Sequence, residues 1–222
     1  MGGAVTSLRR VGSGLSMILA PMLWFASSAL GPGHEASRHL ADMLSQIAAN
    51  PNRFLASVLS GLLSLILFVP AVLGVENLVH RRRPLLALTG AALVVIGLLS
   101  LAVVQGVQLV QHQMIPAPAD REQMVALLQR LEGGIGLKVI FVGTFALFLG
   151  WVIMSAALLA TRVVPRVIPL SILVSLALNL VGFERFSRVI FVVGLGWLGL
   201  LVVGRRDNAW AALDRDVGPS MS

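Results

Sequence analysis

The sequence contains no cysteine, and this absence removes several kinds of chemistry at once. Disulfide bonds, thiolate metal sites and cysteine nucleophiles are all excluded. Histidine is also scarce: the chain has four, and none falls at the centre of a long apolar segment, which argues against a membrane haem protein. No aspartate or glutamate lies at such a centre either, and this weakens every interpretation as an ion-coupled transporter.

Charged residues are few, at 12% of the chain, whereas apolar residues make up 57%. Soluble domains have about 25% charged residues, so the composition excludes an ordinary soluble domain and indicates a membrane protein. The 222 residues are accounted for by one integral membrane domain, residues 1–222. The net charge of +7 does not indicate binding to nucleic acid, because the arginines stand at the ends of apolar segments, where they direct membrane insertion.

Long apolar segments recur along the chain and are separated by arginines, prolines and glycines. A hydrocarbon core about 30 Å thick needs about 20 apolar residues in a helix. The pattern therefore predicts an all-α fold, a polytopic transmembrane helix bundle with six spans. The predicted spans are residues 11–30, 54–79, 85–111, 135–161, 167–183 and 189–203.

Two parts of this threading have alternatives. The last two spans are short and flank a predicted turn at residues 184–188, so a re-entrant hairpin is the rival to two full crossings. The first span follows Arg9 and Arg10 and contains small residues at 26–29, which are also features of a signal peptide. Its length, and the more hydrophobic spans after it, favour an uncleaved span.

The positively charged residues favour a threading with both termini inside. With the N-terminus inside, the short inner loops carry the denser positive charge. The cysteine-free composition, rich in alanine and arginine, suggests a bacterial source, so we expect a multi-pass protein of the bacterial cytoplasmic (inner) membrane. The arginines placed inside are Arg9, Arg10, Arg81, Arg82, Arg83, Arg162, Arg166, Arg205, Arg206 and Arg215.

Two segments of the outer loops predict amphipathic helices, residues 35–49 and residues 120–131. The first places Leu40, Met43, Leu44 and Ile47 on one stripe, and the second begins with a capping-box spacing before its own apolar face. Such helices can lie on a bilayer, but more often they cover the end of a helix bundle. We expect the second arrangement here.

Two motifs resemble chemical signatures without fitting them. Residues 194–199 have the glycine spacing of a dinucleotide fingerprint, but they lie inside a predicted span, where small residues allow close helix packing. His34 and His39 are five residues apart, whereas two zinc ligands on one helix face need a spacing of four. A looser metal site of His34, His39 and His112 is an alternative. We expect no metal, cofactor or catalytic site.

The best functional signal is a polar stripe at the outer end of the third span. Gln105, Gln108 and His112 stand at positions i, i+3 and i+7 of one helix face. Polar groups inside a membrane usually face the bundle interior or water. Under the predicted threading three further polar residues reach the same depth, which predicts a ligand-binding pocket in the outer leaflet, with interhelical hydrogen bonding as the rival. These residues are Lys138, Asn179 and Glu184.

A second polar pair is predicted at the inner end of the second span. Glu76 and His80 stand at positions i and i+4, beside Asn77. Such a pair can relay protons. A salt bridge to the arginines at 81–83, or simple exposure to solvent, is the more ordinary interpretation.

The outline resembles a family of bacterial six-helix membrane proteins known as domain of unknown function 4386. The resemblance covers roughly residues 15–203. It rests on the large first outer loop with its alanine-rich helix, on residues 47–54 (IAANPNRF) leading into the second span, and on the second outer helix. The resemblance implies the six-helix fold and brings no functional residues.

These observations predict a non-enzymatic protein that binds a small or lipid-like molecule, or a membrane protein partner, through the outer polar pocket. A small-molecule transporter is the alternative, because six spans allow two inverted repeats of three. An intramembrane enzyme is a second alternative, weakened because paired carboxylates, a histidine cluster and an activated nucleophile are not visible. The partners expected are the lipid bilayer and such a ligand, not nucleic acid.

Overall fold

The structure is a computed structural model that describes residues 2–31, 40–114, 130 and 134–204. All regular structure in these ranges is α-helical, which confirms the all-α part of the predicted fold class. The helices are α1 (Gly2–Leu30), α2 (Leu40–Ala49), α3 (Pro51–His80), α4 (Pro84–Met114), α6 (Ile135–Thr161), α7 (Val167–Leu180) and α8 (Glu184–Gly204).

Five helices in the described ranges are long and apolar enough to cross a membrane: α1, α3, α4, α6 and α8. Among the six predicted spans α7 is the exception, because its 14 residues extend only about 21 Å. The turn before α8 also lies earlier than predicted, at residues 181–183, where Gly182 has a φ of 90°. Glu184 therefore begins α8 and does not lie in the turn. The helices indicate a multi-pass membrane protein.

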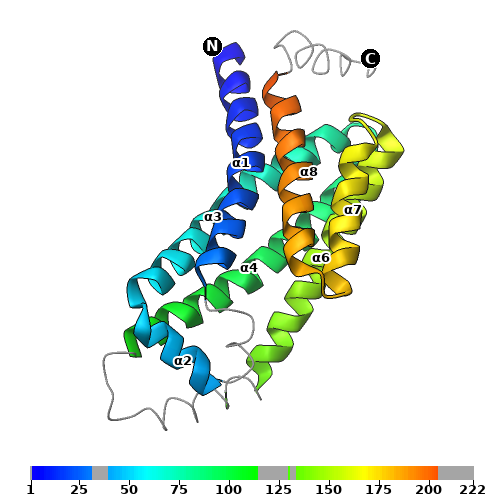
Figure 1. Ribbon diagram of the computed structural model, residues 1–222. Helices are drawn as coiled ribbons and strands as arrows, with labels where there is room; N and C mark the ends of the chain where they lie inside the picture. Colours follow the sequence, from blue (N-terminus) through cyan, green and yellow to red (C-terminus); the bar gives the residue numbers. More distant parts are fainter. Residues whose placement is uncertain (1, 32–39, 115–129, 131–133, 205–222) are drawn as a thin grey trace, which may run out of the picture.

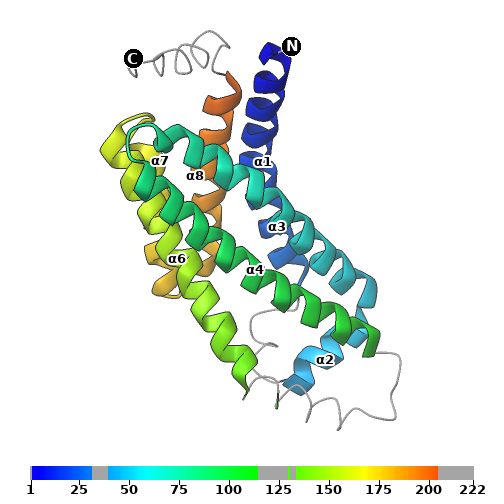
Figure 2. The same cartoon turned by 180° about the vertical axis from the view of Figure 1, so that it is seen from behind.

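The contacts of the six longer elements form a closed ring, and Figure 1 and Figure 2 show the bundle from two opposite sides. α1 packs against α3 and α8, α4 packs against α3 and α6, and α7 packs against α6 and α8. The N-terminus of α1, the α3–α4 and α6–α7 connections and the end of α8 lie at one end of the ring. We call this the arginine end, and the opposite end, which carries α2, the α2 end.

Aromatic side chains fill the middle of the ring. Phe68 of α3, Trp151 of α6 and Phe191 of α8 contact one another, and the Trp151 and Phe191 rings meet edge to face with centroids 5.3 Å apart. Such pairs contribute about 0.5–1.5 kcal/mol beyond the area that they bury. The centre is therefore a packed core that joins three helices.

The outside of the ring is apolar as well. Soluble proteins rarely expose large contiguous apolar patches, so this surface fits hydrocarbon. Exposed large apolar side chains include Ile66, Leu88, Phe141, Phe145, Val193 and Leu200.

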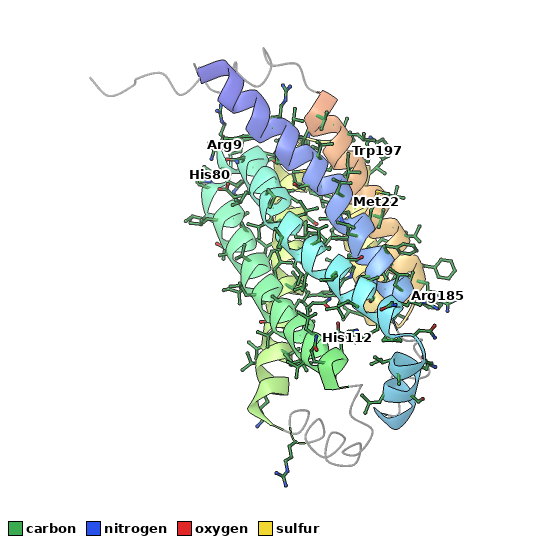
Figure 3. All side chains as sticks on the ribbon, turned by 90° about the vertical axis from the view of Figure 1, so that its left-hand side faces the viewer. Arg9, Met22, His80, His112, Arg185 and Trp197 are labelled. Carbon is green, nitrogen blue, oxygen red and sulfur yellow. The ribbon has the colours of Figure 1, made fainter. Side chains whose placement is uncertain are left out.

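A shallow groove of about 490 Å³ runs between α1 and α8 on this outer surface. Met22 and Trp197 lie on its two sides (Figure 3), and Gly196, which precedes Trp197 on α8, has open space where a Cβ would stand. All of its lining residues are apolar or glycine. The groove therefore offers few polar contacts that would select one ligand, and we do not place the functional site there.

The helix α2 packs against the start of α3 with its apolar face. Leu44 and Ile47 are buried, and Ile47 packs with Phe54 and Val58 of α3. The predicted stripe is thus confirmed at these two positions. Residues 35–39 and the predicted helix at residues 120–131, apart from Arg130, lie outside the described residues.

Candidate functional site

One amide of the polar stripe on α4, that of Gln105, is buried inside the bundle. Gln105 has only 7% of its surface exposed, while Gln108 and His112 are partly buried further along the helix. The Oε1 atom of Gln105 is buried and has no hydrogen-bond partner among the described residues. A buried polar atom without a partner typically costs about 1–3 kcal/mol, so this amide has unused capacity for hydrogen bonding.

The space that Gln105 occupies exists because α3 carries a glycine opposite it. A Cβ added to Gly61 would collide with the amide nitrogen of Gln105 and would lie 2.9 Å from its Cδ. The same Cβ would lie 3.0 Å from the hydroxyl oxygen of Ser27 on α1. The amide of Gln105 and the hydroxyl of Ser27 therefore lie beside each other over Gly61, where α1, α3 and α4 meet.

Serine hydroxyls join α1 to α3 at this point. The hydroxyl of Ser57 donates to the backbone carbonyl of Ser27 at 2.6 Å, and the two serine hydroxyl oxygens are 3.5 Å apart. Both serines are buried. We call Gln105, Ser27, Ser57 and Gly61 the amide cluster; it contains an amide and two hydroxyls within a largely apolar bundle.

His112 extends the polar stripe toward the α2 end. Its ring stacks on Phe54 of α3, with centroids 6.4 Å apart and an angle of 14° between the planes. Both ring nitrogens are buried and have no hydrogen-bond partner among the described residues. Phe54 is also covered by Ile47 of α2, so α2 and α3 together shield one side of the imidazole.

The other three predicted site residues lie on helices other than α4. Lys138 is exposed near the start of α6, and Asn179 is exposed near the end of α7. Glu184 pairs with Arg188 one turn further along α8, at 2.6 Å. Figure 3 shows Arg185, the neighbour of Glu184, well apart from His112. The structure thus keeps the α4 stripe together and places Asn179 and Glu184 at a separate α7–α8 turn.

The sequence pattern does not single out Ser27, Ser57 or Gly61 as parts of the site. Ser27 stood among the small residues that resemble a cleavage site. The available signal was a small residue on each of two spans at the depth of Gln105, but spacing along one helix does not say which helix faces another.

The other motifs take ordinary structural roles. A Cβ at Gly199 would lie 2.5 Å from the carbonyl oxygen of Gly14 on α1, and one at Gly194 would collide with the Ser171 hydroxyl on α7. These contacts confirm a helix-packing role for Gly194 and Gly199, whereas Gly196 faces open space. Glu76 and His80 bond to each other at 2.5 Å on an exposed helix end.

The described residues contain no group of three or more histidine, aspartate or glutamate side chains placed to hold a metal ion. His34 and His39, the other members of the alternative metal site, lie outside the described residues.

No family model matches the chain, and neither a curated protein nor a solved structure does. The resemblance to the domain of unknown function 4386 family stays a prediction that rests on residues 15–203 of the sequence.

Proposed function

We propose that the protein is a non-enzymatic membrane receptor whose amide cluster binds a small polar molecule or a lipid head group near the α2 end. The observation that carries the proposal is the Oε1 atom of Gln105, which is buried and accepts no hydrogen bond from the described residues. In hydrocarbon an unsatisfied amide is costly, so a donor supplied by a ligand stabilises the bound state.

The chemistry of the cluster defines the kind of ligand. A carbonyl oxygen accepts hydrogen bonds, so Gln105 fits a hydroxyl or an amine on the ligand. The two unpartnered nitrogens of His112 extend the polar surface by one donor and one acceptor when the ring is neutral. A molecule with adjacent hydroxyl or amine groups, such as a glycerol or ethanolamine head group, matches this set.

The alternatives have less support. A transporter needs a pathway between the two ends, but Phe68, Trp151 and Phe191 pack across the middle of the ring. An intramembrane enzyme needs an activated nucleophile or paired acids, and the amide cluster offers only an amide and hydroxyls.

Replacement of Gln105 by leucine tests the proposal. The purified protein is incubated with ethanolamine, glycerol and phosphatidylethanolamine, and thermal unfolding is recorded. At least one of these probes should raise the Tm of the native protein and of the control Gln113→Leu, which changes an exposed amide on the same helix. The same probe should leave the Tm of Gln105→Leu unchanged, because leucine cannot accept its hydrogen bond.

Folding itself should survive the substitution. Interhelical hydrogen bonds in membranes contribute about 0.6 kcal/mol on average, and Gln105 leaves its Oε1 atom unused. An equal ligand-induced rise in Tm for Gln105→Leu and the native protein, or no rise with any probe in either, would contradict the proposal.

We also propose six crossings with both termini in the cytoplasm of a bacterium, α7 being the shortest. Arg166 precedes α7, and an arginine at a helix end can reach the interface and so extend a short span. In the predicted threading the α2 end is outside. The alternative, a re-entrant α7–α8 hairpin, places the turn at residues 181–183 on the cytoplasmic side.

Single cysteines in the cysteine-free chain separate these threadings. Ser187 is unsuitable for labelling because it is buried and bonds to Ser175, so Arg185 takes its place. An impermeant thiol reagent applied to sealed cells should label Asn52→Cys and Arg185→Cys but not Pro165→Cys, all three being exposed positions. Labelling of Arg185→Cys only after the cells are opened would favour the re-entrant hairpin.

A further inference from the structure

Two short loops carry arginines side by side at the arginine end. The guanidinium of Arg82, between α3 and α4, donates to the backbone carbonyl of Thr161, at the end of α6, at 2.5 Å. This bond ties the α3–α4 loop to the α6–α7 loop, and Figure 1 and Figure 2 both show the two loops together. A guanidinium has five N–H donors, so this single bond leaves Arg82 with further donors.

Two more arginines lie in the α6–α7 loop. Arg162 follows α6 in a left-handed conformation, with a φ of 52°, and its backbone N–H donates to the carbonyl of Leu158. Arg166 is the residue immediately before α7. The side chains of Arg82, Arg162 and Arg166 are all exposed. We call these three residues the arginine triad.

The helix ends and the charges around the triad favour an anion. α4 begins at Pro84 and α7 begins at Val167, so two helix N-termini, each with a partial positive charge, lie in these same loops. Glu76 is the one carboxylate that the described residues place at the arginine end, and it is engaged with His80. Negative charge from the described part of the protein therefore does little to neutralise the triad.

Exposed apolar side chains lie next to the arginines, at the starts of α4 and α7. Leu85, one residue into α4, is 79% exposed, and Val167, the first residue of α7, is 59% exposed. These apolar neighbours would not stabilise a bound free phosphate ion. They would stabilise a bound phospholipid, because its phosphate lies at the level of the loops while its acyl chains lie along the helices.

We propose that the arginine triad binds the phosphate of an anionic phospholipid of the surrounding leaflet, with Leu85 and Val167 against its acyl chains. The chain has 16 arginines and a single lysine, Lys138. Arginine contacts phosphate oxygens through two parallel hydrogen bonds, whereas lysine acts as a point charge. Basic positions between membrane helices on the cytoplasmic side bind such head groups. The bond from Arg82 to Thr161 goes beyond what membrane insertion alone requires, because insertion needs only the charge.

Binding of phosphatidylglycerol to the purified full chain tests this site. The protein in phosphatidylcholine nanodiscs is titrated with phosphatidylglycerol, and retained lipid is counted by native mass spectrometry. The double variant Arg162→Gln/Arg166→Gln should bind phosphatidylglycerol about 30-fold more weakly, from the usual contribution of each surface arginine. The matched control is Arg130→Gln/Arg185→Gln, which removes two exposed arginines that lie outside the α3–α4 and α6–α7 loops and should bind as the native protein does.

Two further measurements keep the test decisive. Leu85→Asn leaves every arginine in place and should weaken binding of phosphatidylglycerol without changing binding of soluble glycerol 3-phosphate. If the arginine double variant does not fold, Leu85→Asn still tests whether the acyl chains contribute to binding. Equal losses in the triad and control variants would show unspecific charge attraction and overturn the site. Tight binding of glycerol 3-phosphate, with no gain from the acyl chains, would overturn the lipid as its occupant.

Discussion

The α4–α6 and α1–α3 interfaces are both built from small residues, but they use them in different ways. Between α4 and α6 the glycines bring backbone against backbone: a Cβ on Gly150 would lie 2.8 Å from the carbonyl oxygen of Gly90, and one on Gly97 would lie 2.8 Å from that of Gly143. Gly90 and Gly97 are seven residues apart on α4, and Gly143 and Gly150 are seven residues apart on α6. A continuous line of small residues, which we call the glycine seam, therefore runs along the interface.

Between α1 and α3 the small residues are mostly serines that bond across the gap. Ser64 donates to the carbonyl of Ala20 at 2.7 Å, and Ser57 donates to that of Ser27 at 2.6 Å. A hydroxyl leaves more space between two helices than a bare glycine does. The α1–α3 interface therefore has room for a polar side chain from a third helix, and the Gln105 side chain of α4 lies over Gly61 there.

The largest expected effect comes from filling the glycine seam. Gly150→Leu places a side chain against the backbone of Gly90 and against Val94, so α4 and α6 must move apart. Overpacking of this kind usually costs about 1–3 kcal/mol and occasionally more, and a clash with backbone belongs at the upper end. We expect the variant to lose most of its folded, monodisperse fraction in detergent, measured by size-exclusion chromatography and thermal unfolding.

The matched control is Gly196→Leu on α8. A Cβ there meets nothing within 4 Å, because Gly196 faces the apolar groove between α1 and α8. The same increase in volume should therefore leave the Tm close to that of the native protein. If both leucine variants unfold alike, the seam is not the special feature of α4 and α6 that the geometry indicates.

A smaller effect is expected at Gly61, on the other interface. The first atoms that a methyl group would meet belong to the flexible Gln105 side chain, with Ser27 next, so the clash is softer than at Gly150. Gly61→Ala should cost about 1 kcal/mol more in the native background than in the Gln105→Ala background. A double-mutant cycle on thermal or denaturant unfolding measures this coupling. Additive effects of the two substitutions would show that Gln105 does not occupy the space over Gly61.

Much of the fold follows from glycines, prolines and arginines that mark the helix ends in the sequence. The predicted span at residues 135–161 coincides with α6, because two glycines precede it and Arg162 and Pro165 follow it. The sequence pattern predicts the start of α8 too late, because it places a turn at the charged residues 184–188. Glu184 and Arg188 form an i, i+4 pair that suits the first turn of a helix, and Gly182 supplies the actual turn.

The site was predictable only in part, for a physical reason. Spacing along α4 correctly places Gln105 and His112 on one face of one helix. The rotation of α1 and α3 toward that face depends on side-chain packing between segments far apart in sequence, so the roles of Ser27 and Gly61 are not encoded locally. A shared depth in the membrane also does not imply contact. The sequence pattern places Asn179 in one site with Gln105 because of depth alone, but Asn179 lies on α7, which packs against α6 and α8.

The smallest expected effect is the loss of one hydroxyl from the α1–α3 interface. Ser64→Ala removes the buried bond to the carbonyl of Ala20 and changes the side-chain volume little. Interhelical hydrogen bonds in membranes average about 0.6 kcal/mol and reach about 1.7 kcal/mol, so we expect a loss of stability in that range, measured by reversible denaturant unfolding. Ser28→Ala is the matched control, because the Ser28 hydroxyl bonds only within α1, to the carbonyl of Trp24, and its removal should change stability less. A loss at Ser64 no larger than at Ser28 would mean that the serines separate α1 and α3 without holding them together, and the two interfaces would then differ only in their spacing.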